Sequence, residues 1–265
     1  MIATVSIPFD EFSSFMRGPA QGPAKIIEAF HSDSANYFTE RGTDLKNHPE
    51  IKVLQPFSLR SGEQITDAID EHITQALAAY NKVLSLGGDH SVTYPIIRAF
   101  AKKFKKLSIL HIDAHPDLYD EFEGNKLSHA CPFARIMEQG LAQRLVQIGI
   151  RTMARHQREQ ADRFEVEVIE MKDFDPLRLY HFDGPVYVSL DIDAIDPAFA
   201  PGVSHHEPGG FTTREVLTIL QKLKCNVVGA DIVEFNPVRD TSGITAMLGA
   251  KLYKEMLDVL LRSTE

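Results

Sequence analysis

Short apolar runs recur along this 265-residue chain, and amphipathic or polar segments separate them. Runs of this length, rich in Val, Ile and Leu, are typical of strands that are buried on both faces. The pattern predicts strands at Met1–Ile7, Lys82–Leu86, Leu107–Ile112, Arg144–Ile150, Val166–Ile169, Val186–Leu190 and Val227–Val233. Residues 31–50 are polar and irregular, and we expect a surface loop there.

Segments with helical spacing lie between these runs. They are Ala24–Phe30, Gln64–Tyr80, Ser91–Lys106, Pro132–Gln139, Arg155–Arg163, Arg214–Lys222 and Ile244–Arg262. Pro23 suits a first helical turn, and Thr212 or Thr213 suits a helix N-cap. Regular alternation of strands and helices predicts an α/β fold with a mostly parallel sheet covered on both faces. No linker or repeat interrupts the pattern, so residues 1–265 are expected to form a single domain.

Four of the apolar runs end in polar motifs. The motif Asp113-Ala114-His115-Pro116-Asp117 follows Leu107–Ile112 directly. In an extended chain residues two apart point the same way, so Asp113, His115 and Asp117 could converge. The carboxyl end of a strand in an open α/β sheet is also where ligands bind. A ligand site is therefore expected here, although a polar turn would explain one such motif alone.

Six candidate metal ligands occupy three of these strand ends: His90, Asp113, His115, Asp117, Asp191 and Asp193. Oxygen-rich sets with some imidazole suit Mn²⁺ first, with Mg²⁺, Ni²⁺, Co²⁺ or Zn²⁺ as alternatives. Six groups are too many for one catalytic zinc, but they suit two ions that share bridging carboxylates. Such a pair activates water, so the set predicts metal-assisted hydrolysis.

Other polar residues near these motifs have simpler explanations. Asp89 suits a helix cap, Asp196 before a proline suits a turn, and His111 inside an apolar strand suits a hydrogen-bonded core histidine. Cys131 has no context that would activate a thiol. His205 and His206 lie in a loop, where a surface or substrate-channel position is expected.

Charge and cysteine content narrow the function classes. The net charge of −9 argues against a broad nucleic-acid surface and mildly favours a small cationic substrate. No apolar run is long enough to span a membrane, and the N-terminus reads as a strand and not as a signal peptide. Two cysteines, Cys131 and Cys225, lie far apart in sequence, which predicts a reduced, cytoplasmic protein.

Three motifs together resemble the signatures of the arginase/agmatinase (ureohydrolase) family. They are Gly87-Gly88-Asp89-His90, the Asp113–Asp117 motif, and Ser189-Leu190-Asp191-Ile192-Asp193-Ala194-Ile195-Asp196-Pro197. Further stretches, such as Phe122–Ala130 and Val233–Pro237, resemble the plant-type branch. The resemblance covers most of the chain. It implies a three-layer α/β/α fold with a central sheet of about eight strands, and homo-oligomers built as trimers or hexamers.

The resemblance also implies a role for each candidate ligand. His90 and Asp117 would hold one Mn²⁺ ion, His115 and Asp193 would hold the second, and Asp113 and Asp191 would bridge the two. A hydroxide between the ions would attack the guanidino carbon of the substrate. Asp191 would in addition accept a hydrogen bond from a substrate N–H.

Two further residues match functional positions of the family. His129 matches a histidine that moves protons, and an expelled amine does need a general acid. Glu234 matches a glutamate that grips the guanidinium, whose paired N–H groups fit a carboxylate. On the residues alone, His129 could instead bond to backbone and Glu234 could be a solvated loop residue.

The substrate stays open between L-arginine and agmatine, each cleaved to urea and an amine. Guanidinobutyrate, guanidine and formiminoglutamate are alternatives, as are a deacetylase-like metal amidohydrolase and a metal-storage protein. Many family members differ from this chain at residues 203–208 and at Ala130, on substrate-facing loops. Candidate contacts to the substrate tail are Asn125, Lys126, Ser128 and His205.

Overall fold

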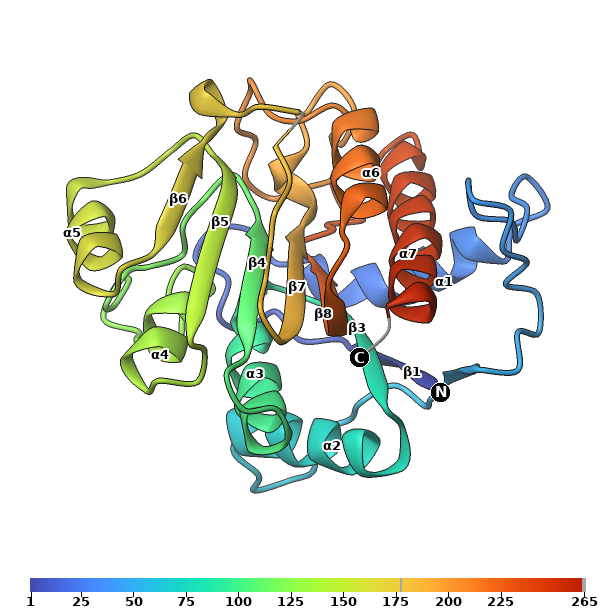
Figure 1. Ribbon diagram of the computed structural model, residues 1–265, viewed down its shortest axis with the longest axis horizontal. Coiled ribbons are helices and arrows are strands. Elements are labelled where there is room, and N and C mark those ends of the chain that lie inside the picture. The colour runs from blue at the N-terminus through green and yellow to red at the C-terminus, as the bar shows by residue number, and fades with distance from the viewer. Residues whose placement is uncertain (177, 264–265) are drawn as a thin grey trace.

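The computed structural model describes residues 1–176 and 178–263, and its centre is a sheet of eight strands (Figure 1). The strands are β1 (Ile2–Ile7), β2 (Ile51–Val53), β3 (Lys82–Gly87), β4 (Ser108–Ile112), β5 (Arg144–Ile150), β6 (Glu167–Glu170), β7 (Pro185–Asp191) and β8 (Asn226–Val233). Their spatial order is β2-β1-β3-β8-β7-β4-β5-β6. Every neighbouring pair is parallel. The sheet is thus wholly parallel, where the sequence predicted a mostly parallel one.

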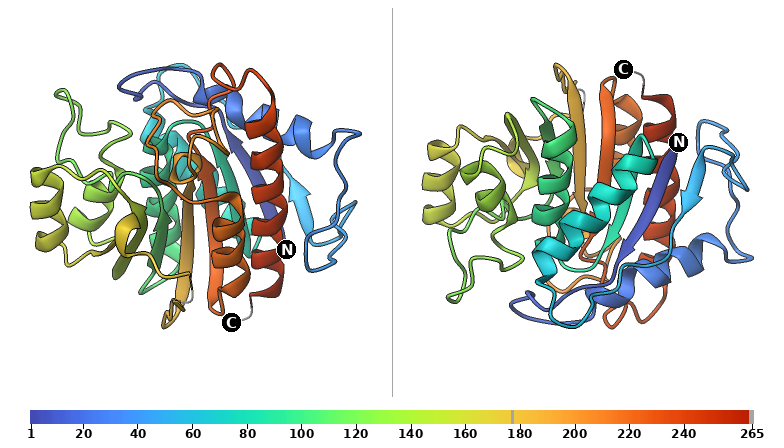
Figure 2. Two further views of the ribbon diagram at one scale, coloured as in Figure 1. Left: turned by 90° about the horizontal axis from the view of Figure 1, so that it is seen from above. Right: turned by 90° about the horizontal axis from the view of Figure 1, so that it is seen from below.

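Seven α-helices of the described residues surround this sheet. They are α1 (Gly22–Phe30), α2 (Ile65–Ala79), α3 (Thr93–Lys103), α4 (Pro132–Glu138), α5 (Arg155–Arg163), α6 (Thr213–Lys222) and α7 (Ile244–Arg262). α1 and α6 pack against α7, whereas α3 packs against α2 and α4. Figure 2 shows these two groups on opposite faces of the sheet, which confirms the expected three-layer α/β/α arrangement. None of the helices described here is long and apolar enough to cross a membrane.

The continuous apolar character of the strands follows from this double covering. Leu84 and Leu110 belong to the core beneath α1, α6 and α7. Val83 and Ile109, the preceding residue in each strand, belong to the core beneath α2, α3 and α4. Successive side chains point to opposite faces of a sheet, so a strand covered on both sides needs apolar residues at every position.

The structure departs from the predicted elements at one strand and at several helix boundaries. Strand β2 was not predicted; it has only three residues and lies at the edge of the sheet, with two of them exposed. α3 begins at Thr93 and not at Ser91, because His90–Val92 form a 3₁₀ turn, in which the Ser91 amide donates to the Asp89 carboxylate. The expected capping role of Asp89 is confirmed.

The central feature for function is the adjacency of four strands. β3, β8, β7 and β4 are neighbours in the middle of the sheet, although β8 is last in the chain. Because they are parallel, their carboxyl ends meet at the same edge. The four strand ends that carry polar motifs therefore lie side by side.

The Thr212 hydroxyl caps α6 by accepting a hydrogen bond from the Glu215 amide. The Glu215 carboxylate in turn accepts a bond from the Thr212 amide. Thr212→Ala should reduce the free energy of unfolding by about 1 kcal/mol, because it leaves an amide of the first turn unpaired. The measurement is chemical denaturation. Thr213→Ala is the matched control, and an equal loss in both variants would contradict the capping role.

Candidate active site

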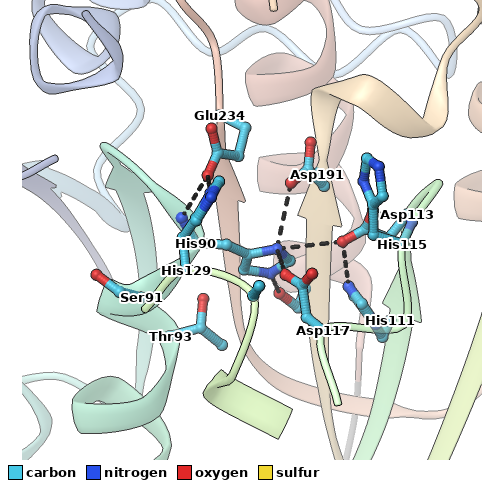
Figure 3. Close-up of polar contacts among 12 residues, drawn as sticks. His90, Ser91, Thr93, His111, Asp113, His115, Asp117, His129, Asp191 and Glu234 are labelled. Carbon is cyan, nitrogen blue, oxygen red and sulfur yellow. Dashed lines mark hydrogen bonds and ion pairs between the residues drawn. The ribbon is translucent and has the colours of Figure 1, made fainter. Parts of the chain in front are cut away.

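A cavity of about 360 Å³ opens at the carboxyl ends of these central strands. Its walls include His115 and Asp117 after β4, Asp191 at the end of β7, Asp193 just after it, and Glu234 after β8. Figure 3 shows Asp117 and Asp191, which come from different strand ends, both turned toward the His90 imidazole. The sheet topology therefore brings together residues that lie far apart in sequence.

The first cluster centres on the buried imidazole of His90. Its Nδ1 atom lies 3.1 Å from Asp113 Oδ2, 3.1 Å from Asp117 Oδ2 and 3.2 Å from Asp191 Oδ2. Yet this nitrogen makes no hydrogen bond with the described residues. Oxygen and nitrogen ligands held at about 2.1 Å from a divalent ion are about 3 Å from one another. The three nitrogen–oxygen distances match that spacing, and an imidazole nitrogen that faces three carboxylate oxygens is a donor set suited to a divalent cation.

A second cluster shares a residue with the first. His115 Nδ1 lies 3.1 Å from Asp193 Oδ2 and 3.6 Å from Asp113 Oδ1. Asp113 thus presents Oδ2 to the first cluster and Oδ1 to the second. The donor atoms of Asp113, His115 and Asp193 are close enough together to hold a metal ion. The geometry fits two neighbouring cations with Asp113 between them.

The Asp113–Asp117 motif reaches this arrangement by turning, not by staying extended as expected. The Asp113 carboxylate accepts a 2.7 Å hydrogen bond from the His115 amide, which closes a tight turn. Asp117 then has φ of +49°, a left-handed conformation that is uncommon outside glycine and tends to occur at functional sites. This turn, and not strand periodicity, aims Asp117 at His90.

His111 supports Asp113 from within β4. Its Nε2 atom lies 2.7 Å from Asp113 Oδ2, and its Nδ1 atom accepts a 3.0 Å hydrogen bond from the side-chain amide of Gln147. His111 lies near enough to His90 and Asp113 to resemble a third ligand. Both of its ring nitrogens are already used, however, so we interpret it as a hydrogen-bonded core histidine. The sequence pattern predicted this character, but it did not reveal the contact with Asp113.

His90 has a comparable support on its other side. Its Nε2 atom lies 3.0 Å from Ser189 Oγ, and that hydroxyl donates a 2.7 Å hydrogen bond to the buried carboxylate of Asp231. Such outer contacts fix the orientation of an imidazole ligand and the nitrogen that carries its proton. Period-two spacing could have indicated Ser189, because it lies two residues before Asp191 on β7.

Burial of so many carboxylates perturbs their proton affinities. Burial is the main cause that raises the pKa of Asp191 well above its usual range, and repulsion from Asp193 and Asp113 adds to it. Burial likewise raises the pKa of Asp193 to about 6. Neighbouring anions in a dry site disfavour ionisation unless positive charge lies between them. The cluster is therefore electrostatically suited to cations.

His129 and Glu234 form a pair beside the carboxylate clusters. His129 Nδ1 lies 2.8 Å from Glu234 Oε1, and the same oxygen accepts a 2.9 Å bond from the His90 amide. Burial lowers the pKa of His129, but the Glu234 carboxylate outweighs that effect and raises it to about 9. Glu234 is buried, so it is not the solvated residue that the sequence alone left open. The His129 ring does bond to backbone, at the Ser14 amide, but its other nitrogen contacts Glu234.

The expected contacts to a substrate tail divide into two groups. His205 lines the cavity, with its ring centroid 5.4 Å from that of His129. The other three lie outside the walls of this cavity. Asn125 accepts a bond from the Leu127 amide, Ser128 is buried, and Lys126 pairs with Asp120. The tight turns of residues 122–131 direct these side chains elsewhere.

Cavity residues that were not predicted from the sequence come from three loops and from α5. They include Ser14, Tyr119, Thr152, Met153 and Gln157. No local pattern marks them, because each is brought to the site by the tertiary fold. Cys131 is buried, and burial raises the pKa of its thiol to about 12, so it is unsuited to act as a nucleophile.

Known proteins similar to this chain include plant and bacterial enzymes. "Arginase 1, mitochondrial" of Arabidopsis thaliana is 46% identical over an alignment of 272 positions that covers 95% of this chain and 79% of the relative. "Agmatinase" of Bacillus anthracis is 34% identical over an alignment of 264 positions that covers 97% of this chain and 90% of the relative. The structure of the Medicago truncatula arginase superposes with a TM-score of 0.91 at 41% identity, covering 99% of this chain and 87% of that one.

The expectation of a cytoplasmic protein is contradicted by these comparisons. Arginases of Arabidopsis thaliana and Medicago truncatula are named mitochondrial, and a second Arabidopsis arginase, 42% identical, is named chloroplastic/mitochondrial. The prediction was wrong because two separated cysteines indicate only that thiols stay reduced. They do not distinguish the cytosol from the interior of an organelle.

Residues 1–258 match the sequence pattern of the family described as "Arginase family". That match covers nearly the whole chain, and it agrees with the relatives and with the structural superposition. The resemblance inferred from the three motifs is confirmed. The chain belongs to the arginase family, and it is a hydrolase that acts on guanidino C–N bonds.

Proposed function

We propose that this protein hydrolyses L-arginine or agmatine to urea and an amine, with two Mn²⁺ ions bound by the two carboxylate–imidazole clusters. The observation that carries the proposal is the buried His90 Nδ1, which faces three carboxylate oxygens at 3.1–3.2 Å without a hydrogen bond. His90, Asp113, Asp117 and Asp191 would hold one ion, and His115, Asp113, Asp191 and Asp193 the other. Bound there, divalent cations supply water of lowered pKa as the nucleophile.

Glu234 is placed to bind the guanidinium group. Its Oε1 atom is committed to His129 and to the His90 amide. Its Oε2 atom accepts no hydrogen bond from the described residues, and Glu234 lines the cavity. A carboxylate oxygen free on the cavity side can accept an N–H of a planar guanidinium, and the charge assists that bond. Glu234 would thereby orient the guanidino carbon toward the clusters.

His129 is placed to move the proton that the reaction requires. An amine is a poor leaving group until its nitrogen is protonated, so bond cleavage needs an acid at that nitrogen. The Glu234 carboxylate raises the pKa of His129 to about 9 against the cost of burial, which keeps a proton on the ring near neutral pH. His129 would donate this proton to the departing nitrogen.

The choice between the two substrates depends on the outer part of the cavity. Apart from the proposed metal ligands, His129 and Glu234, its walls carry neutral side chains such as Thr152 and Gln157, and no lysine or arginine of the described residues lines it. The arginine α-carboxylate would therefore rely on neutral donors such as Thr152, which favours agmatine. The greater identity to plant arginases favours L-arginine. Release of urea from each compound by the Mn²⁺-loaded protein tests both. No urea from either would contradict the proposal.

Asp191→Ala should lose metal and turnover together, because it removes a donor from both clusters. We expect metal affinity to fall by more than the roughly 10- to 100-fold typical of contacts outside the ligand shell. Metal content after dialysis measures the effect. Asp162→Ala on α5 serves as the control. Full metal content in Asp191→Ala would mean that this residue is not a ligand.

His129→Ala should lower kcat by about 10²- to 10⁴-fold, the range for removal of a general acid or base. Its metal content should match that of the unmodified protein. Steady-state kinetics and metal analysis together make the measurement, with the exposed His181→Ala as the control. A loss of metal from His129→Ala would refute the proton-transfer role.

Glu234→Gln should lower kcat/KM for guanidino substrates by at least about tenfold, because a neutral amide makes weaker bonds than a carboxylate to a charged donor. Inhibition by free guanidinium should weaken in parallel. The exposed Glu121→Gln is the matched control. If Glu234→Gln retained the KM and the turnover of the unmodified protein, the proposed guanidinium contact would be wrong.

A further inference from the structure

The loop between β1 and α1 places Ser14 against the outer nitrogen of His129. Ser14 Oγ lies 2.8 Å from His129 Nε2, and the Ser14 amide nitrogen lies 3.2 Å from the same atom. Ser14 and His129 both line the cavity, although they are 115 residues apart in sequence. None of the three signature motifs includes Ser14.

This contact completes a hydrogen-bonded series of three side chains. Glu234 Oε1 bonds to Nδ1 of His129, and Ser14 bonds to Nε2. A backbone amide can only donate, so its contact with Nε2 suits the ring after it has given up a proton, with the remaining proton on Nδ1 and a lone pair on Nε2. The Ser14 hydroxyl can donate to this lone pair, and it can also rotate to accept from Nε2–H once that nitrogen is protonated. The Ser14 hydroxyl can therefore hydrogen-bond to Nε2 whether the His129 ring is protonated or neutral.

The loop that carries Ser14 is fixed by its own hydrogen bonds. The buried Asp89 carboxylate accepts a 3.1 Å bond from the Phe12 amide, and the Phe12 carbonyl accepts one from the His129 amide. At the far end, Asp10 accepts bonds from the amides of Gly18 and Ala20. Rigid support of this kind is what a functional contact requires. The position of Ser14 is therefore set by the fold and not by chance at a mobile loop tip.

The backbone at Gly88 shows how closely this loop packs. A Cβ atom on Gly88 would lie 1.9 Å from the Phe9 carbonyl oxygen, so only glycine allows the approach. The Asp89 amide also donates to that carbonyl. The Gly88-Asp89 segment of the first signature thus packs against the β1–α1 loop and holds it in place, and it also directly precedes His90.

We propose that Ser14 is a positioning residue for His129, which holds the imidazole toward the cavity through Nε2 while the ring gains and loses its proton. The proposal rests on the proposed role of His129 in proton transfer. It predicts that loss of the Ser14 hydroxyl slows the chemical step and leaves substrate and metal binding intact.

The test compares Ser14→Ala, Ser14→Thr and Ser13→Ala in the metal-loaded protein. Ser14→Ala should lower kcat by about 10- to 100-fold, the cost of a misplaced catalytic group, with KM changed less than about twofold. Ser14→Thr keeps a hydroxyl and should retain most of the turnover. Ser13 lies next along the loop, but its hydroxyl bonds to Asp89 and not to His129, so Ser13→Ala should behave as the unmodified protein.

A second readout needs no substrate. The ¹⁵N resonance of His129 Nε2, identified with His129→Gln and recorded with diamagnetic Zn²⁺ bound, should shift in Ser14→Ala and stay in place in Ser14→Thr. An unshifted resonance and unchanged kcat in Ser14→Ala would overturn the proposal, as would equal effects in Ser13→Ala. If the unmodified protein releases no urea, the proposed function fails, and the resonance still reports whether Ser14 holds the ring.

Discussion

The structure depends on how four carboxylates can share one buried space. Asp113, Asp117, Asp191 and Asp193 converge at the carboxyl ends of β4 and β7, with side chains that are almost inaccessible to solvent. Removing charges from water is costly, and bringing like charges together adds to that cost. The imidazoles of His90 and His115 face these oxygens but do not neutralise the set. Divalent cations between them would satisfy the charge and geometry together, and the rest of the site is arranged around that requirement.

Two kinds of element contribute to the site. Strand ends and the tight turns after them supply the proposed ligands, and buried partners such as His111 and Ser189 hold those ligands from behind. Loops supply the cavity walls, which include Ser14 and His205. A rigid sheet can fix donor atoms closely, whereas loops can vary without disturbing the metals. Substrate preference is therefore expected to reside in the loops.

Much of this arrangement was accessible from the sequence, and the limits have physical causes. The strands ending near His90, Asp113 and Asp191 were predicted because buried parallel strands need continuous apolar runs. The convergence of these strand ends was inferred from their ligand types and from the family resemblance. Periodicity does not give the order of the strands, since β8 inserts between β3 and β7 only in the folded sheet. The left-handed turn at Asp117 and the contact of Ser14 with His129 depend on tertiary packing, and no local pattern indicates either.

The most direct test of the account is to locate bound metal by anomalous X-ray scattering from crystals grown with Mn²⁺. The account predicts two peaks in each chain, one beside His90 Nδ1 and one beside His115 Nδ1, with the Asp113 carboxylate between them. A single peak, or no peak within the clusters of a folded, Mn²⁺-saturated protein, would contradict it.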